Sequence, residues 1–159
     1  MSILKDLHIV NPYNDLDLKL IKKFCQENNN KLYEDLGKIR KNYSEEQYKH
    51  QEEVNIINKK NYYTLKEDKI SNFIYAELEK DTKTANLYPT INNYIKNLIP
   101  ELSEYLIMNN NMEKIFVFVK KGDIKTAQNL LENNFLSLST EDEEEYIPFL
   151  KENQTEEGW

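Results

Sequence analysis

The chain has 159 residues and a mass of 19.0 kDa, enough for one domain with a real apolar core but not for two domains of normal size. Residues 1–140 contain 20 basic and 20 acidic side chains, whereas residues 141–159 contain 1 and 8, so the net charge of -7 arises in the C-terminal segment. A neutral body has no extended basic face, which argues against nucleic-acid binding through phosphate neutralisation.

The N-terminal segment carries charges inside its only apolar stretch, and no apolar run reaches membrane length. The sequence therefore predicts a soluble, cytoplasmic protein with no membrane partner. The single cysteine, Cys25, allows no intrachain disulfide, and its spacing from Ile21 predicts an inward-facing helical position. His8 and His50 lack neighbours at ligand spacing, so no metal site is expected.

The first third of the chain reads as a short strand followed by helices. Residues 3–10 have strand character, and Asn14 or Asp15 can cap the helix that follows. "SEEQ" at Ser44–Gln47 has the form of a capping box, so a later helix is predicted to start at Glu45. The apolar positions at helical spacing are Leu16, Leu20, Ile21 and Phe24 in one helix, and Leu32, Leu36, Ile39 and Tyr43 in the next.

The middle of the chain predicts three antiparallel strands. "NYYTL" and "ISNFIYAEL" are rich in aromatic and β-branched residues, and the polar "KEDK" between them can turn a hairpin. After a second polar turn, "ANLYPTI" can form a third strand. Pro89 would then lie at an edge or a bulge, because proline cannot donate to the ladder.

The last third predicts helix, strand, helix and a closing hairpin. Pro100 suits the first position of a helix lined by Leu102, Tyr105 and Leu106 and ended by the asparagines at 109–111. "IFVFV", residues 115–119, reads as a central strand covered on both faces. Asp123 is expected to cap a helix with Ile124, Ala127, Leu130 and Leu131 inward, and "FLSLS" and "EYIPFLK" alternate like two paired strands around the acidic run 141–145.

These elements together predict an α+β protein with a mixed, mostly antiparallel sheet flanked by helices. We expect a single domain over residues 1–151. Residues 152–159 form an acidic segment that reads as a frayed, mobile terminus.

The order of the elements resembles the GNAT superfamily of acetyltransferases over nearly the whole chain, from Ile3 to Lys151. "YYTLKEDKISNFIYAEL" is similar to the family's hairpin with a charged tip. "IFVFVKKGDIKTAQNLLENNF" is similar to its central strand, short turn, helix with an inward alanine, and phenylalanine opening the next strand. The resemblance implies the GNAT-like, acyl-CoA N-acyltransferase fold.

The resemblance also implies acetyl-CoA as cofactor, held in a wedge between two strands with its pyrophosphate on a glycine-rich loop at a helix N-terminus. The corresponding loop here is "YIKNLIPEL", residues 94–102. It departs from the family pattern, because Lys96, Leu98 and Pro100 stand about where glycines are expected. The cofactor-binding candidates that the resemblance gives are Leu87, Tyr88, Tyr94 and Lys96.

The catalytic positions depart from the family pattern too. The position of the family's strand glutamate is Thr84 or Asn86, and that of its helix tyrosine is Leu131, so neither the base nor the acid is present there. The substitutes nearby are Glu77 and Glu79, which share one strand face by their period of two, and Tyr88.

Two functions stay open on this basis. The first is a divergent GNAT-like N-acetyltransferase that transfers an acyl group from acetyl-CoA or a related thioester to an amine, which would be a small molecule, a protein N-terminus or a lysine. The second is a pseudoenzyme, an inactive GNAT-fold module that binds a protein or a small ligand, which the joint loss of glycines, base and acid favours.

Overall fold

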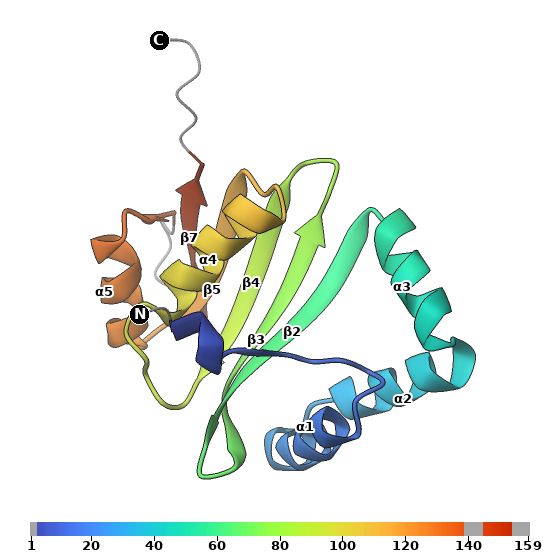
Figure 1. Ribbon diagram of the computed structural model, residues 1–159. Coiled ribbons are helices and arrows are strands. Elements are labelled where there is room, and N and C mark those ends of the chain that lie inside the picture. The colour runs from blue at the N-terminus through green and yellow to red at the C-terminus, as the bar shows by residue number, and fades with distance from the viewer. Residues whose placement is uncertain (1–2, 139–144, 154–159) are drawn as a thin grey trace.

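The computed structural model describes residues 3–138 and 145–153 (Figure 1). Residues 141–144 of the acidic run 141–145 and residues 154–159 of the predicted terminal segment lie outside the described residues. The helices are η1 (a 3-10 helix, Ile3–Asp6), α1 (Asp15–Asn28), α2 (Leu32–Asn42), α3 (Glu45–Val54), α4 (Leu98–Asn109) and α5 (Ile124–Glu132). The strands are β1 (His8–Ile9), β2 (Ile57–Lys66), β3 (Lys69–Glu79), β4 (Thr84–Ile91), β5 (Lys114–Lys120), β6 (Leu136–Ser137) and β7 (Tyr146–Glu152).

The described strands form one seven-stranded sheet in the order β1-β2-β3-β4-β5-β7-β6. β4 and β5 pair in parallel, and the remaining neighbours pair antiparallel. The prediction of an α+β protein with a mixed, mostly antiparallel sheet is confirmed, as is the closing hairpin of β6 and β7.

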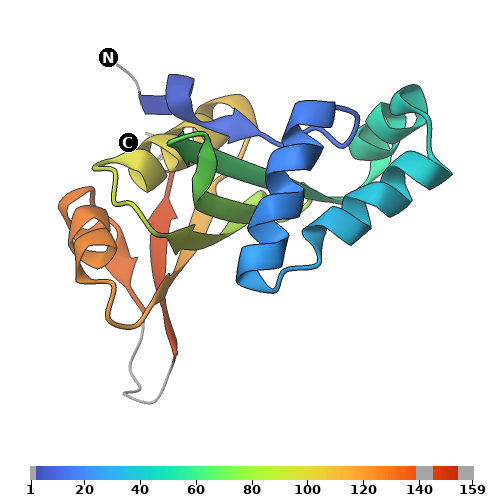
Figure 2. The ribbon, with the colours of Figure 1, turned by 90° about the horizontal axis from the view of Figure 1, so that it is seen from below.

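The two faces of the sheet are covered by different helices. Successive strand residues point to opposite faces, so Tyr62 packs in one apolar cluster with α4 and α5, while Tyr63 packs in another with α1 and α2. Figure 2 shows α1, α2 and α3 gathered at one side of the molecule and α5 at the opposite side. We call these the α4–α5 face and the α1–α3 face.

Local sequence signals explain where several helices begin. The Asn14 side chain accepts a hydrogen bond from the Asp17 amide at the start of α1, and the Asp123 side chain accepts one from the Thr126 amide at the start of α5. Ser44 and Gln47 form the predicted capping box at the start of α3. Each side chain satisfies an amide that the helix itself leaves free.

Some predicted positions are wrong. Residues 3–6 form a 3-10 helix, and only His8 and Ile9 remain of the predicted first strand. Leu16, Ile124 and Leu131 are exposed, because each helix packs through a narrower stripe than its apolar residues span. Tyr105 is also largely exposed, beside the buried Leu106.

The predicted burial of β5 on both faces is also wrong. Ile115, Val117 and Val119 are buried against α4 and α5, whereas Phe116 and Phe118 on the other face are only half-buried. The reason is tertiary: α1 and α2 cover β2 and β3 on that face and leave β5 largely open.

Among residues 3–138 and 145–153, no helix is long and apolar enough to cross a bilayer. The same residues contain no group of three or more His, Cys, Asp or Glu side chains that could hold a metal ion. Cys25 is buried, as its helical spacing predicts, and burial raises the pKa of its thiol.

Candidate functional site

β4 and β5 run side by side for only part of their length. Their parallel ladder ends at the pair Leu87 and Val117. Beyond it, Tyr88–Ile91 stays paired with β3 and Phe118–Lys120 stays paired with β7, so each strand presents an unpaired edge to the other. We call the space between these two edges the β4–β5 gap. Pro89 lies on such an edge, as predicted, so its missing N–H does not interrupt the β4–β5 ladder.

A row of aromatic rings crosses the mouth of the gap on the α1–α3 face. The Tyr75 and Tyr88 rings stack with centroids 5.8 Å apart, and the Tyr88 and Phe118 rings stack at 4.9 Å with planes 7° apart. Tyr88 and Phe118 are the first residues beyond the last ladder pair, so this stack marks the point where the strands part. Tyr88 remains 39% exposed, which leaves one side of the row open to solvent.

Glu77 lies beside this row. It shares the strand face of Tyr75, and its Cα partner on β4 is Asn86, two residues before Tyr88. Burial raises the pKa of Tyr75 to about 12, with the charge of Glu77 and its hydrogen bond to the phenol adding to the effect. Burial and the charge of Glu77 also raise the pKa of Tyr88. Both phenols therefore hold their protons firmly at neutral pH.

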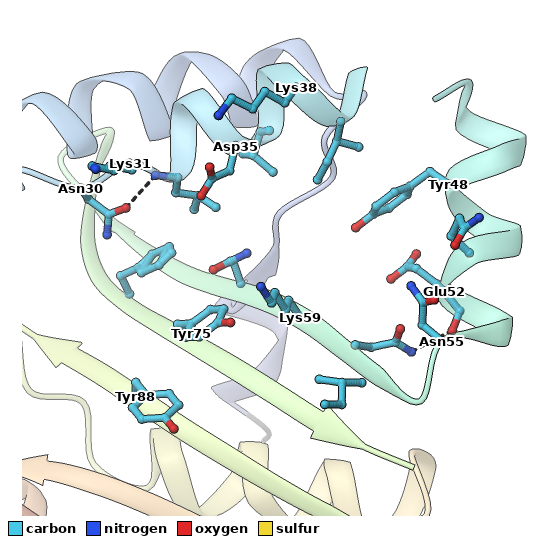
Figure 3. A pocket seen from close by; sticks show the side chains of 18 of the residues that line it. Asn30, Lys31, Asp35, Lys38, Tyr48, Glu52, Asn55, Lys59, Tyr75 and Tyr88 are labelled. Carbon is cyan, nitrogen blue, oxygen red and sulfur yellow. Dashed lines mark hydrogen bonds between the residues drawn. The ribbon is translucent and has the colours of Figure 1, made fainter. Parts of the chain in front are cut away.

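A groove of about 780 Å³ lies between this part of the sheet and helices α2 and α3. Tyr75, Tyr88, Thr90 and Phe73 form its floor, and side chains of α2 and α3 form its walls. Figure 3 shows the Asp35 carboxylate directed from α2 toward the sheet and Tyr48 directed inward from α3. The groove has the size of sites that take small organic ligands.

The α3 wall is attached mainly by polar contacts. Lys60 pairs with Glu52, and the Lys80 ammonium donates to the backbone carbonyls of Glu52 and Glu53 at 2.7 and 2.9 Å. The Tyr13 hydroxyl donates to the Tyr43 carbonyl at 2.8 Å, at the opposite end of the helix. No residue of α3, all of which the structure describes, is buried. This wall can therefore shift at a lower cost than a wall built from core side chains.

Charged groups of both signs line the groove. Asp35 acts on Tyr75, since its charge contributes to the raised pKa of that phenol. Lys31, Lys38 and Lys59 supply the positive groups. The carboxylates of the walls and the tyrosine rings of the floor can attract a cationic amine, and Lys31 and Lys38 lie on or beside α2 and Lys59 lies on β2.

The segment between β4 and α4 consists of residues 92–97, which is shorter than the predicted loop at 94–102. α4 begins at Leu98, so Pro100 is its third residue and not its first. That position still belongs to the first turn, where an amide has no partner within the helix. Leu98 is only 2% exposed and packs in the core instead of filling the outer side of the loop.

The loop residue with a left-handed backbone is Asn97, with φ of 67°. Asparagine tolerates this region better than most residues other than glycine. Hydrogen bonds from Asn129 of α5 and from Asn133, the C-cap residue that follows α5, hold the Asn97 side chain in place. Side-chain amides thus fix the loop in the segment where the sequence resemblance implies glycines.

The structure places the candidate residues from the sequence on β3 and β4 or in the loop before α4. Tyr88 and Glu77 meet at the mouth of the gap, while Glu79 lies two residues further along β3, opposite Thr84. Tyr94 and Lys96 are exposed in the loop. The Lys125 ammonium lies 5.8 Å from the centre of the Tyr94 ring, and burial, with smaller effects of Glu132 and Asp123, raises the pKa of that phenol.

Leu87 and Leu131, the remaining two positions considered from the sequence, do not place a side chain in the gap. The Leu87 side chain is fully buried in the core of the α4–α5 face, so only its backbone reaches the start of the gap. Leu131, where the family's tyrosine would stand, is 53% exposed on α5.

Sequence reasoning missed the residues that only the fold brings together. Tyr75, Phe118 and Asp35 come from three separate elements, and the period of two along β3 was the one available signal, since it places Tyr75 with Glu77. Asn72 was also missed, although a buried asparagine in an aromatic strand indicates a specific hydrogen-bonding task.

Comparison with solved structures identifies similar folds. The ribosomal-protein-S5-alanine acetyltransferase of Vibrio fischeri aligns with a TM-score of 0.63 and 12% identity over 92% of each chain. Spermidine N-acetyltransferase of Vibrio cholerae gives 0.59 and 15%, over 93% of this chain and 94% of its own. The N-acetyltransferase PseH of Campylobacter jejuni, in complex with acetyl coenzyme A, gives 0.57 and 14%, over 93% and 99%.

Neither a protein-family sequence model nor a curated protein sequence matches this chain. The likeness is therefore one of structure, spread over more than nine-tenths of the chain at low identity. This chain has the fold of the GNAT N-acetyltransferases.

Proposed function

We propose that this chain is an N-acetyltransferase that transfers an acetyl group from acetyl-CoA or a related thioester to an amine. The observation that carries the proposal is the junction of the β4–β5 gap with the groove. Tyr88 begins the unpaired edge of β4 and also forms part of the groove floor. A donor in the gap and an acceptor in the groove would therefore meet beside Tyr88 and Glu77.

The gap fits one part of such a donor. The unpaired backbone groups of Tyr88–Ile91 and Phe118–Lys120 can bond an extended pantetheine arm as they would bond another strand. When bound, the thioester would supply an acyl carbon open to attack and a sulfur able to leave. The loop at 92–97 fits the diphosphate of CoA poorly, because side chains of this chain already occupy several of its amides.

Glu77 is the group we propose as proton acceptor for the incoming amine. Its neighbour across the strands is Asn86, one of the two positions at which the sequence resemblance implies a glutamate, and Tyr88 lies two residues further along β4. An amine attacks only after it loses a proton, and a carboxylate at the junction can take that proton directly or through water.

Tyr88 is the group we propose as proton donor to the departing sulfur. Its pKa is raised by burial and by Glu77, so the phenol stays protonated at neutral pH. The stack on Phe118 fixes the ring at the mouth of the gap. Tyr75, stacked on the other side and close to Glu77, orients both groups.

For the acceptor we propose a small amine, a protein N-terminus or a lysine, and for the setting the cytoplasm. The groove is large enough for a polyamine or a few peptide residues. Asp35 and the tyrosines at its floor favour a positively charged ligand. The lone, buried Cys25 is typical of a reducing compartment.

The direct test measures acetyl transfer from acetyl-CoA and from S-acetylpantetheine to a linear polyamine, a peptide with a free N-terminus and a lysine peptide. We expect turnover with at least one acceptor, and a loss of about 10²-fold or more in Glu77→Gln. Glu79→Gln is the matched variant, because it changes the same side chain two residues further from the junction. Equal rates in the two variants, or no transfer by the native chain, would contradict the proposal.

The second candidate is the non-catalytic binding module, which the occupied amides of the loop favour. In that case neither thioester stabilises the protein at millimolar concentration, since a ligand that binds the native state alone must raise its stability. Robust transfer that depends on Glu77 would exclude this candidate.

A further inference from the structure

The first half of the loop after β4 is clamped by Asn72 of β3. The Asn72 side-chain oxygen accepts hydrogen bonds from the amides of both Asn92 and Asn93, each at 2.9 Å. Its side-chain nitrogen donates to the Asn93 carbonyl at 2.6 Å. Asn72 is 1% exposed, so the clamp is part of the interior. One buried carboxamide oxygen thus occupies two of the loop amides.

The second half is clamped by Asn129 of α5, which is 5% exposed. Its side-chain oxygen accepts from the Asn97 amide at 2.9 Å, and its nitrogen donates to the Asn97 side-chain oxygen at 2.9 Å. The Leu98 amide donates to the Ile95 carbonyl at 3.3 Å, and Pro100 has no amide proton. The start of α4 therefore offers few of the donors that make a helix N-terminus a phosphate site.

These bonds set a cost on diphosphate binding. A phosphate oxygen that took the Asn97 amide, or both the Asn92 and Asn93 amides, would leave a buried carboxamide oxygen without its backbone donor, which is unfavourable. The amides of Tyr94 and Lys96 have no acceptor within the described part of the chain, but they lie in the exposed middle of the loop. They lack the support of the helix dipole, which acts over the first turn.

The β4–β5 gap carries no such obstruction, because both of its edges remain unpaired within the described residues. We propose that this chain selects its donor by the pantetheine thioester alone, with the nucleotide diphosphate adding little affinity. Asn72 and Asn129 are the residues that determine this specificity. The inference rests on the proposed function, because it concerns the donor of that same reaction.

The test compares the affinities of acetyl-CoA, S-acetylpantetheine and ADP by calorimetry on the full chain. We expect the dissociation constants of the two thioesters to agree within about threefold, and ADP to give no heat at millimolar concentration. Acetyl-CoA binding about 30-fold tighter than S-acetylpantetheine would overturn the inference and leave the proposed function standing. If neither thioester binds, the proposed function fails and the inference fails with it.

Amide exchange tests the clamps without any donor. In the native chain the Asn92, Asn93 and Asn97 amides should exchange at least about tenfold more slowly than those of Tyr94 and Lys96. Asn72→Ala should abolish the protection at Asn92 and Asn93 and keep it at Asn97, and Asn109→Ala on the exposed end of α4 should change neither. Uniform exchange along the native loop, or ADP-induced shifts of these amide signals, would contradict the inference.

Discussion

The two faces of the sheet are built differently. The α4–α5 face holds a continuous apolar core in which Leu87, Leu102, Leu106, Ile115 and Leu130 are at most 1% exposed. The core of the α1–α3 face is smaller and is covered by α1 and α2, whereas α3 is held by an ion pair and hydrogen bonds. The groove and the Tyr75, Tyr88 and Glu77 group lie on this second face.

One face of the sheet provides a rigid scaffold, and the other carries the polar groups of the candidate site. Tightly packed residues of the α4–α5 face fix β4, β5 and α4, and so fix the gap where the strands part. The α1–α3 face leaves polar groups exposed to the groove and has a wall that can adjust to a ligand. Binding residues on an adaptable surface backed by a rigid scaffold are common in enzymes.

The largest effect is expected in the core of the α4–α5 face. Leu130→Ala should lower the free energy of unfolding by about 2–5 kcal/mol, because the side chain is fully buried and leaves a cavity. Leu131→Ala is the matched control at the next residue of α5, 53% exposed, and should cost about 0.5 kcal/mol or less. Chemical denaturation measures both, and equal losses would show that α5 does not pack as described.

Alkaline pH should weaken the same face through Tyr62. Burial raises its pKa to about 12, so between pH 10 and 12 the unfolded chain loses this proton before the folded chain does. The protonated Tyr62 phenol therefore contributes about 2–3 kcal/mol to the free energy of unfolding below pH 10. This contribution is lost as the pH rises through about 12. In Tyr62→Phe the denaturation midpoint should fall less steeply from pH 9.5 to 12. If the midpoints of the native chain and Tyr62→Phe fall equally with pH, the raised pKa of Tyr62 is contradicted.

On the α1–α3 face, the bond between Tyr63 and Asp17 ties α1 to the sheet. The Tyr63 hydroxyl donates to the Asp17 carboxylate at 2.5 Å, and the other carboxylate oxygen accepts from the Asn11 amide at 2.9 Å. Tyr63→Phe should cost about 2 kcal/mol, since it removes a hydrogen bond to a buried charged group. Tyr33→Phe, at a 38% exposed ring, is the control and should be nearly silent in the same denaturation experiment.

The smallest effect is expected at α3. Ser44→Ala removes the capping box and should cost about 1 kcal/mol, mostly as local opening of α3. Asp123→Ala removes the cap of α5, which packs on the continuous core, and should lower global stability instead. Hydrogen exchange distinguishes the two: faster exchange confined to α3 in the first variant and spread over the sheet in the second. The reverse pattern would refute the division between the faces.

Much of the fold could be predicted because its signals are local. Ser44 and Gln47 lie three residues apart and form the capping box of α3, which does not depend on how that helix packs. Asp123 likewise caps α5 through a residue three positions away. The aromatic and β-branched residues of β3 indicated a strand, and its period of two placed Glu77 and Glu79 on one face. Neighbours along the chain determine such features.

The errors have tertiary causes. Pro100 suits either the first or the third position of a helix, and the packing of Leu98 into the core decided for the third. The run at 115–119 is apolar enough for burial on both faces, but α1 and α2 lie over β2 and β3 instead. In both cases the local pattern allowed two outcomes, and contacts with distant residues selected one.

The sequence by itself determined the order of the main helices and strands, the caps and the absence of glycine from the loop at 92–97, since these depend on residues a few positions apart. Only the tertiary structure decided where β4 and β5 part, which tyrosines meet at that point, and that Asn72 and Asn129 bind the loop amides. Asn72 lies 20 residues before Asn92, whose amide donates to it, and Asn129 lies 32 residues after Asn97, whose amide donates to it. The tertiary structure brings these side chains to the loop amides, and residues so far apart in the chain leave no short-range sequence pattern that predicts the contact.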